Sequence, residues 1–240
     1  LAPEQASWHA ELSLVPGADG AAAQLARELV VGSTSPLLAL PQRTTGALLW
    51  RGDAATQAEE PGAFAASAAK LFGPRLSAEH SKKLSDALTS FAKTRHGASV
   101  LALVPTPAPS ALLTFEVNDA DGFSKAFADV LSLLELPPVS SWLASAWGRP
   151  SLSLSAPASD GSRRARVRFQ RAGAPRPALP GTLWLSWQAR DGVGKVLISA
   201  DEATGLADLT ALPRLDKSAF LAQTSRGLGD QTALALLADV

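Results

Sequence analysis

A short apolar strand, a turn rich in Asp, Asn and Gly, and an amphipathic helix follow one another three times in this chain. The units read WHAELSLV-PGAD-GAAAQLARELV, SALLTFEV-ND-ADGFSKAFADVLSLL and GKVLISA-DEAT-GLADLTAL. Each turn carries an Asp or Asn where the start of a helix needs a side-chain acceptor. The repetition predicts a layered fold of strands and helices. The units are too unevenly spaced for a solenoid, whose repeat has a fixed period.

Apolar periodicity predicts further helices in the first part of the chain. A helical hairpin is expected over about residues 61–95, with Gly73-Pro74 as its link. Gly97 is expected to cap the second of these helices. The clearest helix follows Asn118-Asp119 and is expected to end at Pro137-Pro138. Its apolar residues fall on one helical face: Phe123, Phe127, Val130, Leu131 and Leu134.

Short apolar or alternating runs predict strands along the rest of the chain. After the first unit they are residues 47–50, 99–104, 111–117, 151–155, 164–169, 182–189, 195–200 and 232–237. The pattern predicts an α+β protein: an antiparallel or mixed sheet with helices packed on one face, arranged as two related halves. The expected division is a helix-rich part over 1–140 and a strand-rich part over 141–240, with a single domain as the alternative.

The composition excludes several classes of function. The 240 residues include 22 basic and 22 acidic side chains, so no global field favours nucleic acid. There is no Cys, which excludes disulfides, thiolate metal sites and a thiol nucleophile. No apolar run approaches the length of about 20 residues that a membrane-spanning helix needs. We therefore expect no nucleic-acid partner and no cofactor.

Motifs for catalysis are sparse. Ser-x-x-Lys occurs as Ser67–Lys70 and Ser90–Lys93, a spacing at which a lysine could activate a serine. The companion motifs of penicillin-binding proteins are absent, so solvated side chains are the simpler interpretation. The histidines are scattered and lack metal-ligand spacing: His9, His80 and His96. We therefore assign no catalytic and no metal-binding residue.

The most unusual local chemistry is the basic segment 163–176, which contains no acidic residue. On a strand, Arg164, Arg166 and Arg168 project from one face, and the residues between them face the core. Arg171 extends the basic run. Such a stripe could contact an acidic partner, lipid headgroups or phosphates. The alternative is that the charges only protect an exposed sheet from aggregation.

Two further features are candidates for recognition. Trp142 and Trp147 flank a short segment before Pro150 and could line a ligand groove or a protein interface, with core packing as the alternative. Arg51-Gly52-Asp53 spells an adhesion tripeptide, but the same residues simply end a predicted strand. The candidate binding residues are therefore Arg164, Arg166, Arg168, Arg171, Trp142 and Trp147.

The segments ALLTFEVNDADGFSKAFADVLSLL and GKVLISADEATGLADL, followed by DQTALALLADV, resemble repeated elements of uncharacterised bacterial cell-envelope lipoproteins. In those proteins a hairpin strand is followed by D-x-x-x and a helix, then by a displayed strand and another helix. The resemblance covers roughly the last 140 residues. It implies an exported, non-catalytic protein, but it supplies no site residues, and no lipobox cysteine is present.

These observations lead to three hypotheses about function. The first is a non-enzymatic exported bacterial envelope protein that acts through protein–protein contacts, for instance as an accessory subunit of an assembly. The second is a periplasmic carrier of an apolar ligand such as a lipid, bound between the sheet and the Phe123 helix. The third is a serine hydrolase built on a Ser-x-x-Lys pair.

The chain begins Leu1-Ala2-Pro3 rather than with Met, so we expect a processed or excerpted chain. Signal-peptide removal would place it in the periplasm or at the outer membrane. Peripheral membrane association would then depend on a lipid anchor that is not in this chain.

Overall fold

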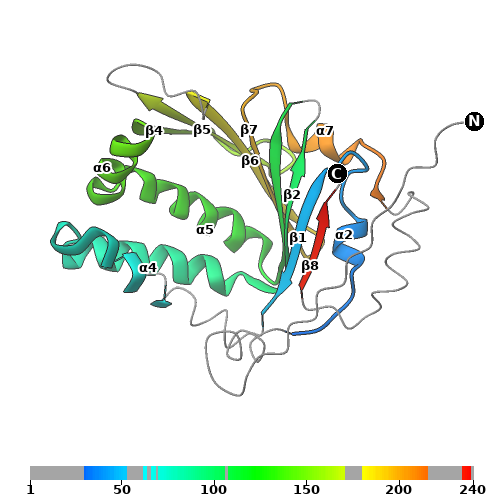
Figure 1. Cartoon of the computed structure of the whole chain (residues 1–240), viewed down its shortest axis with the longest axis horizontal. Coiled ribbons are helices and arrows are strands. Elements are labelled where there is room, and N and C mark those ends of the chain that lie inside the picture. The colour runs from blue at the N-terminus through cyan, green and yellow to red at the C-terminus, as the bar shows by residue number, and fades with distance from the viewer. Residues whose placement is uncertain are drawn as a thin grey trace, which may run out of the picture.

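A computed structural model describes residues 30–52, 62–63, 66–68, 70–105, 108–170, 180–215 and 234–238. These residues form one sheet with helices packed against it (Figure 1). The first strand–turn–helix unit, residues 8–30, lies outside them except for its last residue.

The sheet contains eight strands in the order β4-β5-β6-β7-β3-β2-β1-β8, and each neighbouring pair is antiparallel. This confirms the predicted α+β class and selects an antiparallel sheet. The strands are β1 (Gly46–Arg51), β2 (Arg95–Val104), β3 (Ser110–Val117), β4 (Arg149–Leu154), β5 (Arg163–Gln170), β6 (Thr182–Arg190), β7 (Val193–Ser199) and β8 (Leu234–Ala238). The sheet is continuous across the expected division at residue 140.

The strand order is symmetric about the pair β3 and β7. The consecutive strands β2 and β3 lie on one side of the sheet's centre, and β6 and β7 lie on the other side. β3 pairs with β7, and this register places Leu112 opposite Leu197. A helix follows each central strand: α5 (Ala120–Ser132) after β3 and α7 (Leu206–Thr210) after β7. The second and third units of the sequence therefore meet at the centre of the sheet.

These two helices cover opposite faces of the sheet. Directly paired residues share a face, and residues an odd number of positions apart on one strand point to opposite faces. Leu112 and Leu197 pack with Leu206 of α7, whereas Phe115 and Val196 pack with Phe123 of α5. We call these two sides the α7 face and the α5 face.

The longer helices lie on one face of the sheet, as predicted for the helices in general, but the shorter ones lie on the other face. α4 (Ala78–Lys93) and α5 run side by side, and α6 (Pro137–Ala146) packs near β4 on the same side (Figure 1). The short helices α2 (Ser35–Leu38) and α7 lie on the other side of the sheet, where Leu37 and Leu206 join one buried cluster. Two short 3-10 turns complete the described helices, η1 (Gly73–Arg75) and η2 (Leu133–Glu135).

Helix α5 begins where the sequence places its cap. The Asp119 carboxylate accepts a hydrogen bond from the Gly122 amide at 2.9 Å, which satisfies one of the free amides of the first turn. Phe123 is fully buried and contacts three other phenylalanine rings, Phe91, Phe115 and Phe127, at 5.5–6.3 Å. Trp187 of β6 joins this group and donates its indole N–H to the Ser124 carbonyl at 3.0 Å. An aromatic core therefore fixes α5 on the sheet.

The predicted role of Gly97 is wrong. Helix α4 ends at Lys93 with Thr94 as its last cap, and Gly97 lies inside β2 with φ +60°. The register of β2 against β3 shifts between His96 and Ser99, which marks a β-bulge. This bulge places its residue 97 in the left-handed region, which glycine adopts without steric cost. The helix that follows Asp119 ends before Pro137, as predicted. Pro137 also begins the next helix, α6, which the prediction of a stop did not include.

We expect Phe123→Ala to lower the free energy of unfolding by about 3–5 kcal/mol, because it removes a buried ring and leaves a cavity. Lys125→Ala is the matched control, since Lys125 is exposed on the same helix and should change stability by less than about 0.5 kcal/mol. Denaturant unfolding followed by tryptophan fluorescence measures both variants. Equal, small losses in the two variants would contradict the assigned core.

Candidate functional site

Strand β5 carries the predicted arginine stripe. Ala165 and Val167 are buried on the α5 face, at 1% and 2% exposure. The alternation of a strand then places Arg164, Arg166 and Arg168 on the α7 face. Arg164 and Arg168 are exposed and Arg166 is half-buried. Arg171 lies outside the described residues, so its predicted role stays a prediction.

Lys195 of β7 adds a fourth cation to this face. It pairs with Gln188 of β6 and Thr114 of β3, and this register places it on the same side as Arg164. Burial lowers the pKa of Lys195, and the nearby Arg214 charge lowers it further. We call Arg164, Arg166, Arg168 and Lys195 the basic sheet face. Lys195 is not among the predicted site residues, because alternation along a strand does not reveal which strands become neighbours.

The sheet neighbours of the three arginines are uncharged. Arg164, Arg166 and Arg168 are opposite Ser186, Trp184 and Thr182 of β6, and the last two arginines are opposite Ser153 and Ser151 of β4. The Arg166 guanidinium lies over the Trp184 ring, 5.6 Å from its centre, a cation–π contact. Within the described residues, none of these arginines forms an ion pair with a carboxylate.

One acidic neighbour of this face is Asp160. The Ser162 hydroxyl and backbone amide donate to its carboxylate, and these bonds hold the pKa of Asp160 below its usual range, with a smaller contribution from the Arg164 charge. The Asp208 carboxylate, close to Arg164 across Gly205, is occupied by the Gly205 amide at 2.7 Å. The two carboxylates offset only part of the charge of the four cations, so the basic sheet face keeps an excess of positive charge.

Trp142 and Trp147 form a second surface feature. Each remains exposed, at 41% and 43%, and their rings contact each other edge to face at 6.1 Å. Phe72 packs against Trp142 and Phe169 against Trp147, both at 6.5 Å. We call these four residues the aromatic cluster. The rings support one another, so the two indoles are held at the surface in fixed orientations.

The structure does not bring all the predicted binding residues together. Phe169 belongs to the α5 face of β5 and contacts Trp147. Its neighbour Arg168 points to the α7 face. The basic sheet face and the aromatic cluster are therefore separate surfaces on opposite sides of the same edge of the sheet.

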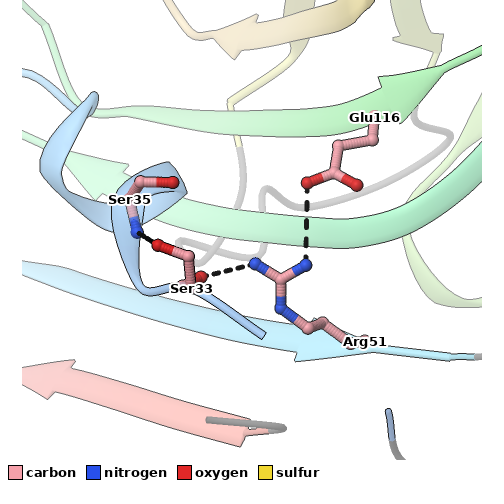
Figure 2. Close-up of polar contacts among 4 residues, drawn as sticks. All are labelled: Ser33, Ser35, Arg51 and Glu116. Atoms are coloured by element: carbon pink, nitrogen blue, oxygen red, sulfur yellow. Dashed lines mark hydrogen bonds and ion pairs between the residues drawn. The ribbon is translucent and has the colours of Figure 1, made fainter. Parts of the chain in front are cut away.

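Arg51, the first residue of the adhesion tripeptide, is buried and takes part in internal contacts (Figure 2). Asp53 lies outside the described residues. The Arg51 guanidinium donates to the Ser33 carbonyl and lies 3.6 Å from a Glu116 carboxylate oxygen. Arg51 belongs to β1 and Glu116 to β3, so the pair reaches across β2 at its bulge. A Cβ atom at Gly97 would overlap the Glu116 carboxylate. The glycine therefore makes room for the ion pair.

The Ser-x-x-Lys pairs show no sign of an activated serine. Ser67 donates its hydroxyl to the Ala63 carbonyl at 3.0 Å, as an ordinary helical serine does. Ser90 and Lys93 are both exposed on α4, and no hydrogen bond joins them. Searched over the described part of the chain, no group of three or more His, Cys, Asp or Glu side chains is arranged to hold a metal ion.

We expect Gly97→Ala to lower the free energy of unfolding by about 2 kcal/mol or more, because it strains a positive φ and displaces Glu116 from Arg51. Gly62→Ala is the matched control: Gly62 is helical and a Cβ there meets nothing within 4 Å, so stability should be unchanged or slightly higher. In a Glu116→Ala background, Gly97→Ala should lower the free energy of unfolding only by the cost of the backbone strain. Thermal unfolding of the four variants measures this; an unchanged loss in that background would rule out the steric coupling.

Lys195→Met is expected to stabilise the protein near neutral pH. The folded-state pKa of Lys195 is lowered, so over part of the pH range the unfolded chain binds a proton that the folded chain does not. Its contribution to stability is therefore unfavourable at neutral pH and improves as the pH rises toward the ordinary lysine value of 10.5. The difference in the free energy of unfolding between the variant and the wild type should shrink as the pH rises to that value. Exposed Lys125→Met is the control, and a pH-independent difference would contradict the assignment.

Comparison of the chain with protein-family models, with curated proteins and with solved structures gave no match in any of the three. The described helices include none that is both long enough and apolar enough to cross a membrane. The candidate surfaces are therefore assigned from the geometry and chemistry of this chain alone.

Proposed function

We propose that this protein is a non-enzymatic binding protein that works through contacts with another protein, as an accessory subunit of an assembly. The observation that carries the proposal is the exposure of Trp142 and Trp147 within an ordered aromatic cluster. Tryptophan is enriched at the energetically dominant positions of protein interfaces, where a rigid ring fills a pocket of the partner. Leu71, at 59% exposure, extends the apolar character of this region beside Phe72.

The aromatic cluster suits a protein partner better than a small ligand. Its rings meet edge to face on the surface, and both tryptophans keep about two fifths of their area open. An interface gains from burying such area, because each aromatic ring removes a large apolar surface from water. An exposed pair held by its neighbours also loses little side-chain freedom on binding.

The carrier hypothesis has less support from the packing. The site expected for an apolar ligand lies between the sheet and α5, where Phe123 is fully buried. The rings of Phe91, Phe115 and Trp187 occupy that layer and contact the helix phenylalanines at 5.3–5.9 Å. Native mass spectrometry of the purified protein distinguishes a protein-binding role from a carrier role, since a copurified lipid would favour the carrier.

The hydrolase hypothesis rests on Ser67 and Ser90, and no described residue makes a contact that would activate either serine. A fluorophosphonate or β-lactam probe that labels either serine would revive it. The compartment implied by the lipoprotein resemblance, the periplasm or outer membrane of a bacterium, belongs to the proposal, and cell fractionation of the native host tests it.

The central test places a benzophenone photo-crosslinking residue at position 142 or 147 in the native host. We expect a discrete adduct with another protein at either position, because the cluster is assigned to the interface. Lys82 is the control site, since its side chain is 76% exposed on α4 and does not belong to the cluster. Absence of adducts at 142 and 147, or the same adducts at 82, would overturn the proposal.

A further inference from the structure

We propose that the basic sheet face is a docking surface for an extended acidic segment of a partner protein. The proposal deepens the function proposed above, because it names the chemistry of the partner and a second surface that contacts it. Three arginines in one row, without carboxylates opposite them, leave positive charge that an acidic partner would complement.

The spacing of the arginines favours an extended chain over a single small anion. Alternate residues on a strand are about 6.6 Å apart, so the Cα atoms of Arg164 and Arg168 are separated by about 13 Å. A phosphate or sulfate ion can reach only one or two of these side chains. Acidic residues at every second position of an extended polypeptide repeat at the same distance of about 6.6 Å. Such a segment can place a carboxylate near each arginine in turn.

The arginines are partly pre-positioned for this contact. The Arg166 guanidinium is held over the Trp184 ring, so less side-chain freedom is lost when it binds. Lys195 lies two strands away on the same face and widens the positive area. The hydroxyls of Ser153 and Thr182, beside the arginines, can donate hydrogen bonds to carboxylates or to a peptide backbone.

The edge of the sheet is a poor alternative for the same segment. β4 is the outer strand on this side, and Pro150 within it has no amide to offer a new strand. The Leu152 amide is already taken by the Glu135 carboxylate, which accepts from it at 3.2 Å. Strand addition along β4 would leave carbonyl acceptors of the incoming strand without donors, whereas the arginine-bearing face is open to side-chain contacts.

Nucleic acid and anionic membrane are disfavoured by the neutral overall charge. The 22 acidic residues balance the 22 basic ones, so the long-range attraction that a polyanion or a charged bilayer needs is missing. A short acidic segment requires only local complementarity. The observations therefore favour a polypeptide.

The test measures binding of a fluorescent peptide of about ten residues with alternating Glu and Ser, by anisotropy at about 50 mM salt. Arg164→Gln/Arg166→Gln/Arg168→Gln should weaken binding at least about tenfold. The control Arg75→Gln/Lys93→Gln/Lys125→Gln removes three exposed cations elsewhere and should bind as wild type does. A triple Arg→Lys variant of the basic sheet face, which keeps the charges, should retain most of the affinity.

Two further peptides test the spacing. A peptide with the same number of Glu residues in adjacent pairs should bind more weakly than the alternating one, and a Gln-Ser peptide should not bind. Equal loss in the control variant would mean unspecific charge attraction and would overturn the proposal. So would tighter, Arg-dependent binding of a single-stranded oligonucleotide, of anionic phospholipid vesicles or of inorganic phosphate. Failure of the Arg→Lys variant to bind, with its fold intact by circular dichroism, would argue against simple charge complementarity.

The outcome can be separated from that of the proposed function. Trp142→Ala/Trp147→Ala should leave peptide binding unchanged, because the aromatic cluster is on the other side of the sheet. Adducts at position 142 without peptide binding would overturn only the acidic-segment proposal. Peptide binding without any adduct would overturn the assigned role of the aromatic cluster.

Discussion

The pairing of β3 with β7 is the constraint on which the rest of the structure depends. These two central strands come from units far apart in the sequence, and their antiparallel register sets which residues share a face. Leu112 and Leu197 point into the core under α7, and Leu113 and Val196 point into the core under α5. A slip of one residue in this pair would exchange the two sets and dismantle both cores.

The placement of the helices explains where free surface remains. The larger helices fill the α5 face, and the short α2 and α7 cover the part of the α7 face over β1, β2 and the central strands. Arg164, Arg166 and Arg168 lie on the α7 face of β5, with Arg164 next to the start of α7. In the described chain this stretch of sheet carries polar and charged residues instead of a packed apolar layer, so its chemistry is available for recognition.

The two candidate surfaces differ in physical character, and one partner could use both. The aromatic cluster offers apolar area, which supplies affinity when water is excluded. The basic sheet face offers charge, which orients a partner and speeds its approach more than it adds affinity. A partner that spans the edge of the sheet would use both, with an apolar anchor on one side and an acidic segment on the other. Either surface alone would make a weaker and less specific contact.

The sequence by itself determined the local structure: the Asp119 cap and the Phe123 stripe predict α5, and the alternation of β5 predicts which arginines share a face. Such features depend on near neighbours, which the sequence displays directly. The role of Gly97 was misjudged, because a glycine after a helix and a glycine in a bulge have the same local pattern. Only the tertiary structure decided that Lys195 joins the arginines, that Arg51 pairs with Glu116, and that the tryptophans lie on the face opposite the basic one. These facts depend on strand order and on the face each helix covers, and both are set by contacts between residues distant in the chain.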